Sequence, residues 1–433
     1  MILSIEPALS LRGKIRVPGD KSISHRAVML GALACGTTEI TGFLKGQDCL
    51  STIRCFRALG VSITMKDSLV TVKGRGLSGL LEPENVLNVG NSGTTMRLIA
   101  GILSGQPFTT VLTGDASIRQ RPMGRVTRPL REMGAVILGR DGGNLAPLVI
   151  RGGNLRPFEY QSPVASAQVK SALLLAGLYA DGWTEVTEPA ISRNHTELML
   201  KSFGADIITN GKSTRIKGRP SLTGQQVVVG GDISSAAFFI VAGLIVPNSR
   251  IIIEGVGLNP TRDGIIEALC AMGAKIRISD VRTIAGELLG TIEAETSELT
   301  GTIFGGEIIP RLIDEIPILA VAALFARGIT EIRDAAELKV KESNRIMAMA
   351  QGLAQLGAKV EELPDGLRIY GGYPLRGSVC QSHHDHRIAM SLAVAGLRAE
   401  GETRIMDADS ISVSFPQFNE TIDLLRGGAV HED

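Results

Sequence analysis

The stretch that decides the fold is "IIEALCAMGAKI", residues 265–276, because its pattern recurs along the whole chain. A helix-like apolar segment leads to a Gly, and a small residue and a strand-like residue follow. Gly at that point suits the positive φ with which many helices end, so the pattern predicts helix, turn and strand. Its recurrence at intervals of roughly seventy residues predicts six copies of one α/β repeat. The other copies centre on Gly60, Gly134, Gly204, Gly357 and Gly428.

A second helix recurs in step with the first. It is Ala- and Leu-rich and is followed by a turn and a β-branched strand, as in "GALACGTTEITG" (31–42) and "VAGLIVPNSRIIIEG" (241–255). A helix that is apolar on all faces is buried, so we expect helices inside each domain and sheets outside. Three repeats per domain make two domains, with the boundary predicted near residues 227–239, where a Gly-Gly pair precedes the fourth buried helix.

Composition excludes several classes of function. The 433 residues carry a net charge of +1 and only 4% aromatic residues, so neither nucleic acid nor an anionic membrane surface is an expected partner. The longest uncharged apolar run, residues 236–246, is too short to span a bilayer. The five cysteines are odd in number and lack CxxC spacing, which predicts reduced thiols and a cytoplasmic protein.

Polar loops precede the buried helices, as in "GDKSISHR" (19–26) and "HHDHRIAM" (383–390). Five of the six loops place Ser, Thr, Asn or Asp where a helix N-cap is expected, and the fifth repeat offers Asp314. Helix N-termini attract anions, and arginines and lysines lie in or near several of these loops. Clustered cations in a nearly neutral chain predict a small polyanionic ligand rather than a long polyanion.

The run His383–His386 is the one segment that resembles a metal site. Consecutive side chains at a helix start diverge, and the i, i+4 spacing of a helical metal site is absent. We therefore expect Asp385 to cap the helix and Arg387 to bind an anion, with no metal. "GNSGTTMR" (90–97) lacks the GK[ST] ending of a P-loop, and no GxSxG elbow occurs in the chain.

Six motifs together resemble those of the 5-enolpyruvylshikimate-3-phosphate synthases, in order and over almost the whole chain. They are "PGDKSISHR" (18–26), "NSGTTMR" (91–97), "GDASIRQRPMGR" (114–125), "SAQVKSALLLAG" (166–177), "LKVKESNR" (338–345) and "DHR" (385–387).

The resemblance implies a fold and an activity. The fold is a two-domain inside-out α/β barrel of six βαβαββ repeats, three per domain, with the active site in the interdomain cleft. The domains are expected at 20–230 and at 1–19 plus 231–433. The activity is transfer of the enolpyruvyl group of phosphoenolpyruvate to the 5-hydroxyl of shikimate 3-phosphate, with release of phosphate. No metal or organic cofactor is implied, we expect a monomer, and glyphosate is expected to compete with phosphoenolpyruvate.

The matching motif positions also imply the residues of the site. For shikimate 3-phosphate they are Ser22, Arg26, Ser166, Ala167, Gln168, Arg193, Asp314 and Lys341. For phosphoenolpyruvate they are Lys21, Gly93, Arg121, Gln168, Arg345 and Arg387, with Asn91 and Arg97 in support.

Proton transfer is expected to fall to the carboxylates Asp314 and Glu342 and to the amines Lys21 and Lys341. Their division of labour stays open. The chain departs from some members of the family at several positions, among them Leu98, where some have Pro, and Asn344, where many have Asp. His25 stands where some have Asn, and Val413 stands where some have a ligand-binding Lys.

Two alternatives stay open. The enolpyruvyl transferases that act on UDP-N-acetylglucosamine share the fold, but they have Lys-Asn after the first turn and usually a Cys in a flexible loop. Here Ser22 follows Lys21, and residues 114–125 contain no Cys. A non-catalytic, anion-binding repeat scaffold would leave Asp314, Lys341 and Glu342 as surface charges. Turnover with phosphate release separates an enzyme from such a scaffold.

Overall fold

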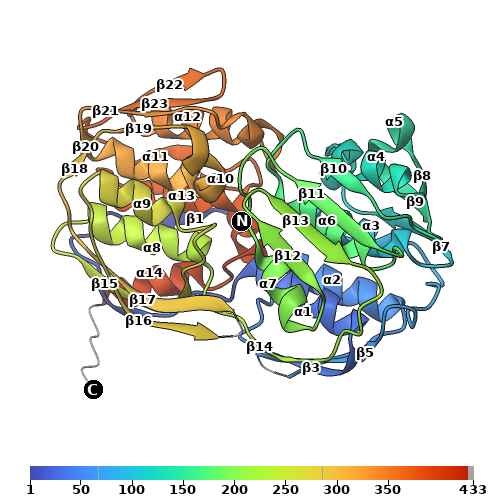
Figure 1. Ribbon diagram of the computed structural model, residues 1–433. Coiled ribbons are helices and arrows are strands. Elements are labelled where there is room, and N and C mark those ends of the chain that lie inside the picture. Colours follow the sequence, from blue (N-terminus) through green and yellow to red (C-terminus); the bar gives the residue numbers. More distant parts are fainter. Residues whose placement is uncertain (67, 285, 428–433) are drawn as a thin grey trace. The chain divides into compact units, whose positions relative to one another are not determined.

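The computed structural model describes residues 1–66, 68–284 and 286–427 (Figure 1). The chain folds into two compact units. Unit 2 is Gly19–Val229 together with Ile284–Glu287, and unit 1 is Met1–Pro18, Gly230–Thr283 and the chain from Leu288 on.

Unit 2 has three buried helices at its core: α1 (Lys21–Leu33), α3 (Gly93–Ser104) and α6 (Ala167–Gly177). α3 packs against both α1 and α6, and each of the three also packs against a sheet. The side chains of α1 from Ile23 onward are all buried, as the all-round apolar pattern predicts. The amphipathic partners are α2 (Gln47–Ala58), α4 (Gly124–Glu132) and α7 (His195–Ser202), with short turns at α5 (Arg140–Gly143) and η1 (Ile118–Gln120).

The three sheets of unit 2 share one topology, in which the first two strands pair in parallel and the others in antiparallel fashion. In sheet order they are β14 (Gln226–Val228), β3 (Cys35–Thr41), β5 (Leu69–Arg75) and β4 (Ser62–Lys66); β6 (Leu87–Asn88), β7 (Thr109–Thr113), β9 (Leu145–Arg151) and β8 (Val136–Gly139); and β10 (Glu159–Gln161), β11 (Trp183–Thr187), β13 (Ser213–Lys217) and β12 (Ile207–Asn210).

Unit 1 repeats the plan with α8 (Ile233–Ile245), α11 (Ile316–Leu324) and α13 (His386–Gly396), which pack against one another. Every residue of α8 and of α11 is buried. The other helices are α9 (Gly264–Ala271), α10 (Ile309–Leu312), α12 (Arg345–Gln355) and α14 (Phe418–Arg426), with 3-10 turns η2 (Gly306–Ile308), η3 (Ala336–Val340) and η4 (Ala408–Val413).

The sheets of unit 1 draw strands from both ends of the chain. β1 pairs antiparallel with β25, and β2 pairs parallel with β15. In sheet order they are β2 (Arg12–Ile15), β15 (Arg250–Gly257), β17 (Glu287–Glu295) and β16 (Lys275–Ile284); β19 (Ile303–Phe304), β21 (Ile329–Ile332), β23 (Gly366–Tyr370) and β22 (Lys359–Leu363); β24 (Val379–Gln381), β25 (Thr403–Met406) and β1 (Leu3–Ile5); and the pair β18 (Leu299–Thr300) and β20 (Ala326–Arg327).

The recurring Gly ends a helix in each repeat that the structure describes. The positive φ that the sequence predicts is confirmed at Gly60, Gly134, Gly204, Gly273 and Gly357. Gly428, the sixth copy, lies outside the described residues.

Side-chain caps begin five of the buried helices: Asp20, Ser92, Ser166, Asp232 and Asp385 each accept a hydrogen bond from a backbone N–H of the first turn. The expectation of an Asp314 cap is wrong. α11 begins at Ile316 after Glu315, and it has no side-chain cap bond. The Asp314 carboxylate is instead drawn to two cations, which hold it more strongly than a helix N-terminus would.

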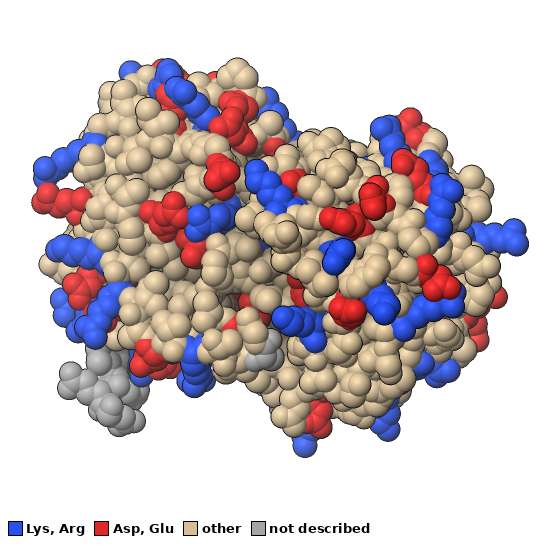
Figure 2. Space-filling model, viewed as in Figure 1, with Lys and Arg blue, Asp and Glu red and all other residues tan. Residues whose placement is uncertain are grey.

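The surface fits the near-neutral composition. On the face in Figure 2, basic and acidic side chains of the described residues are interspersed. No helix in the described part of the chain is both long and apolar enough to cross a membrane.

Candidate active site

The residues that the sequence predicts for the site fall into two groups, one in each unit. In unit 2 the first group begins at the start of α1, where the Asp20 cap fixes the first turn by accepting from Ile23 N at 2.8 Å. Lys21 follows directly, and its Nζ lies 3.2 Å from Asp48 Oδ2 on α2. The Lys21 and Asp48 side chains are only 16% and 12% exposed, so Lys21 is an ordered, largely desolvated cation.

Arg26 lies one turn further along α1 and is buried. Its Nε donates to Thr196 Oγ1 at 2.6 Å, its Nη2 to Ser171 Oγ at 2.8 Å and its Nη1 to Ser22 O at 3.1 Å. These three acceptors are uncharged oxygens, and they orient the guanidinium. The predicted residue Ser22 is thereby joined to α6 and α7.

A second part of the unit 2 group lies at the start of α3. Arg97 Nη1 donates to Gln168 Oε1 at 2.6 Å, and Gln168 Nε2 donates to Thr94 Oγ1 at 3.1 Å. Arg121 Nη2 donates to Asn91 Oδ1. The structure thus brings Asn91, Arg97, Arg121 and Gln168 together around the N-terminus of α3.

Gly93 is the first residue of α3 and is buried beside these cations. A Cβ at this position would lie 3.0 Å from Arg97 Nη1 and 3.3 Å from Arg121 Nη1. Gly93 therefore lets the helix N-terminus approach both guanidiniums closely.

The remaining predicted residues of unit 2 lie around α6 and α7. Ser166 caps α6, whose first residue is Ala167. The backbone N–H of Ser166 donates to Glu188 Oε1 at 2.8 Å. Arg193 is half-buried in the loop that precedes α7.

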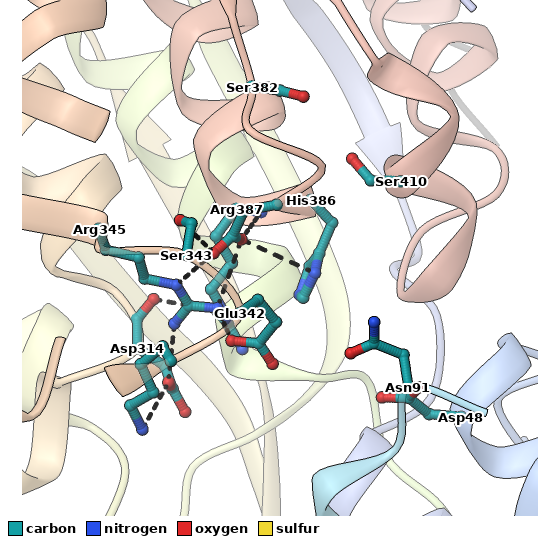
Figure 3. Close-up of polar contacts among 12 residues, drawn as sticks. Asp48, Asn91, Asp314, Glu342, Ser343, Arg345, Ser382, His386, Arg387 and Ser410 are labelled. Atoms are coloured by element: carbon teal, nitrogen blue, oxygen red, sulfur yellow. Dashed lines mark hydrogen bonds and ion pairs between the residues drawn. The ribbon is translucent and has the colours of Figure 1, made fainter. Parts of the chain in front are cut away.

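The unit 1 group is centred on Arg345, whose side chain is 1% exposed at the start of α12 (Figure 3). Three carboxylates surround its guanidinium. Nε lies 2.8 Å from Asp385 Oδ2, Nη1 lies 3.2 Å from Asp314 Oδ1, and Nη2 lies 2.6 Å from Glu342 Oε2. These contacts place two predicted catalytic carboxylates, Asp314 and Glu342, on one buried cation.

Two further predicted cations lie around Asp314. Lys341 Nζ is 3.5 Å from Asp314 Oδ1, the same oxygen that contacts Arg345. Arg387, at the start of α13, donates from Nη1 to the Asp314 backbone oxygen at 3.1 Å and lies 3.7 Å from Glu315 Oε1. Asp314 is thus the residue on which Lys341, Arg345 and Arg387 converge.

Burial and charge compete at the centre of this group. Burial disfavours a charged Arg345, but Asp385, Glu342 and Asp314 outweigh it and raise the pKa of its guanidinium above the ordinary value. Burial alone would raise the pKa of Asp385, yet Arg345 overcomes it and the pKa of this carboxyl is lowered. The Arg345–Asp385 pair therefore stays charged at neutral pH.

His25 takes no charge at neutral pH. Burial first, and then the charges of Lys21 and Arg26, hold the pKa of its imidazole well below 6.5. Its Nδ1 lies 2.6 Å from Thr52 Oγ1, which lies 2.7 Å from Thr95 Oγ1, and Thr95 donates to the α3 cap Ser92 at 2.7 Å. Neutral His25 thus links α1 and α2 to the start of α3.

Sequence reasoning missed several partners of the site residues. Asp48, Ser171 and Thr196 were not predicted, because each joins the site only through contacts between distant segments. Asp385 was predicted only as a cap, and it caps α13 and pairs with Arg345 at once. A signal for its second role is its place beside a predicted ligand-binding arginine in "DHR".

Among the described residues, no group of three or more His, Cys, Asp or Glu side chains is placed to bind a metal ion. The arrangement instead offers arginines, lysines and capped helix N-termini, which bind anions, together with carboxylates that can exchange protons.

A family model described as EPSP synthase (3-phosphoshikimate 1-carboxyvinyltransferase) matches residues 5–422. The chain belongs to the EPSP synthase family. Members of this family are transferases, and so is this chain. It is 59% identical over 423 residues to the 3-phosphoshikimate 1-carboxyvinyltransferase of Desulforamulus reducens, covering 98% of this chain and 99% of that protein. The protein of the same name from Pelotomaculum thermopropionicum is 60% identical, with 98% of each chain covered.

Solved structures agree with this membership of the EPSP synthase family. The EPSP synthase of Acinetobacter baumannii has a TM-score of 0.88 at 46% identity, with 98% of each chain covered. The enolpyruvyl transferase NikO of Streptomyces tendae has a TM-score of 0.81 at 19% identity, over 98% of this chain and 97% of that one. The latter likeness is one of fold alone.

Proposed function

We propose that the two groups of residues carry out the 3-phosphoshikimate 1-carboxyvinyl transfer of the EPSP synthase family. The enolpyruvyl group of phosphoenolpyruvate passes to the 5-hydroxyl of shikimate 3-phosphate, and phosphate leaves. The observation that carries the assignment is the convergence of Lys341, Arg345 and Arg387 on Asp314, with Glu342 on the same guanidinium. It supplies cations for anionic substrates and carboxylates for proton transfer in one place.

The cations divide between the two substrates. In the proposed arrangement, the buried guanidinium of Arg26 and the helix start at Ser166 receive shikimate 3-phosphate. Arg121 and the α3 N-terminus at Gly93 receive phosphoenolpyruvate. The remaining assignments follow the family motifs. Ser22, Ala167, Gln168, Arg193, Asp314 and Lys341 contact shikimate 3-phosphate, and Lys21, Asn91, Gln168, Arg345 and Arg387 contact phosphoenolpyruvate.

The reaction has two steps, addition and elimination, and each step requires two proton transfers. In the addition step, a base takes the proton of the 5-hydroxyl as its oxygen bonds to C2 of phosphoenolpyruvate, and an acid protonates the methylene carbon. In the elimination step, a base removes a proton from that carbon, the C=C bond forms again as the C–O bond to phosphate breaks, and an acid protonates the leaving phosphate. Asp314 and Glu342 are the proposed proton-exchanging groups, and Lys21 and Lys341 stabilise the charge that develops.

The test is phosphate release by the full chain with both substrates and with each substrate omitted in turn. We expect release only when both are present. Release that needs UDP-N-acetylglucosamine instead would favour the related transferase, and no release with any acceptor would favour a binding scaffold. Membership of the EPSP synthase family argues against both alternatives.

We also propose the finer architecture, an inside-out barrel of three repeats in each unit, and a single chain as the active species. Because residues from both units are assigned to one pair of ligands, we expect the units to close on them. Small-angle scattering with shikimate 3-phosphate and an unreactive phosphoenolpyruvate mimic should give a smaller radius of gyration than scattering from the protein alone. An unchanged radius would contradict closure.

A further inference from the structure

Lys170, Glu188 and Glu197 form a buried cluster beside the first turn of α6. None of the three is among the residues assigned to substrate. Lys170 on α6 is 4% exposed, and its Nζ lies 2.9 Å from Glu188 Oε2 and 2.8 Å from Glu197 Oε1. The two glutamates are 4% and 5% exposed. A charge buried to this extent is costly unless it is paired, and the two carboxylates offset the cost of burying Lys170.

The ammonium of Lys170 is stabilised by its partners. Burial disfavours the ammonium of Lys170, but Glu197 and then Glu188 outweigh burial and raise the pKa of Lys170 above its ordinary value. Lys170 is therefore a cation at neutral pH.

The two glutamates differ in what else they contact. Glu188 Oε1 accepts from the backbone N–H of Ser166 at 2.8 Å. Its Oε2 accepts from Ser192 Oγ at 2.7 Å, and Lys170 Nζ lies 3.4 Å from Ser192 O. Apart from Lys170, no described residue hydrogen-bonds to either carboxylate oxygen of Glu197. Of these two glutamates, Glu188, which lies in the loop before α7, is the one that bonds to the loop before α6 in the described part of the chain.

Those two loops carry residues proposed to bind shikimate 3-phosphate. Glu188 contacts Ser166, and Ala167 and Gln168 are the next two residues of the chain. Glu188 also contacts Ser192, and Arg193 is the next residue after it. We infer that Glu188, held in place by Lys170, is a positioning residue that fixes the spacing of these two loops for shikimate 3-phosphate. The inference rests on the ligand assignment proposed above.

The substitution Glu188→Gln isolates this role because it keeps the shape of the side chain. The glutamate presents one oxygen to the Ser166 N–H and the other to the Lys170 ammonium and the Ser192 hydroxyl, so both sides meet donors. A glutamine amide has one oxygen, and in either orientation its NH₂ group faces a donor. Glu197→Gln is the matched control, because its amide oxygen can still face Lys170.

The experiment measures the Kd of shikimate 3-phosphate by calorimetry without phosphoenolpyruvate, and KM and kcat by phosphate release. Glu188→Gln should weaken binding of shikimate 3-phosphate by about tenfold or more and raise its KM similarly, since loss of one buried hydrogen bond commonly costs a factor of that order. Its kcat at saturating shikimate 3-phosphate should stay within about threefold of the parent, and Glu197→Gln should leave Kd within about threefold.

Equal effects of the two substitutions on Kd, or a fall in kcat at unchanged KM, would reduce the cluster to a structural role and overturn the inference. If Glu188→Gln fails to fold, Ser192→Ala removes one Glu188 contact while it keeps the Lys170 pair. It should weaken binding by about threefold, and an unchanged Kd would overturn the inference. A parent protein that binds no shikimate 3-phosphate at all would overturn the proposed ligand assignment itself, which separates the two failures.

Discussion

Replacing Glu342 by glutamine should slow turnover far more than it weakens substrate binding. Glutamine has the same shape, and its amide oxygen can still accept from Arg345 Nη2, which lies 2.6 Å from Glu342 Oε2 in the parent. Asp385 and Asp314 continue to hold Arg345 from its other nitrogens. The substitution therefore removes mainly the capacity to exchange a proton.

The expected loss can be expressed as a barrier. A general acid or base typically contributes about a hundredfold to ten-thousandfold in rate. At about 1.36 kcal/mol per factor of ten, kcat should fall by the equivalent of roughly 2.7–5.5 kcal/mol. The weaker hydrogen bond to Arg345 costs about 1 kcal/mol, which is too little to account for such a fall.

The assay is phosphate release at saturating substrates, with calorimetric binding of shikimate 3-phosphate in parallel. Glu331→Gln is the control, because Glu331 also pairs with two arginines in unit 1, Arg333 and Arg368, but lies outside the proposed site. The control should keep its kcat. If Glu342→Gln keeps kcat within about threefold of the parent, Glu342 is not a proton-transfer group and the assignment fails.

Two more predictions concern unit 2. Because the pKa of His25 is held well below 6.5, the unfolded chain binds more protons than the folded chain below about pH 6.5. The free energy of unfolding should therefore fall with decreasing pH by up to about 1.4 kcal/mol per pH unit, and His25→Asn should lack this component in denaturant titrations; identical pH profiles would contradict it. The methyl group of Gly93→Ala would press on Arg97 and Arg121, 3.0 and 3.3 Å away, and should exclude glyphosate more than the shorter phosphoenolpyruvate. Inhibition titrations at fixed phosphoenolpyruvate should show a sensitive parent and a more tolerant variant, and equal inhibition would refute the steric argument.

Local patterns predicted the start and end of many elements, because caps and turns depend on a few adjacent residues. Asp20, Ser92 and Asp385 cap helices as the polar loops indicate. The positive φ at Gly273 follows from the helix–turn–strand pattern of residues 265–276. In these cases backbone geometry is decided within one turn, so distant residues alter it little.

Prediction from sequence failed where distant charges compete for one side chain. The sequence predicted Asp314 as a helix cap, but its carboxylate forms ion pairs with Lys341 and Arg345, which lie about 30 residues further along the chain. The Lys170–Glu188 pair was missed for the same reason, because its partners become neighbours only once α6 has packed. A lone lysine in the apolar run "AQVKSALLLAG" (167–177) is the signal that could have revealed it.

The pairing of β1 with β25 bears on how the chain is made. Leu3 stands opposite Ile405, so β1 is synthesised about 400 residues before the strand with which it pairs. Residues Gly19–Val229 of unit 2, in contrast, form one continuous segment whose sheets contain only strands from within it. Domains generally fold as units during synthesis, from the N-terminus onward, and contacts between distant residues form slowly. Unit 2 can therefore fold while translation continues, whereas the apolar β1 strand stays without its partner until Thr403–Met406 emerges. A nascent chain that stalls earlier presents that strand to chaperones and proteases.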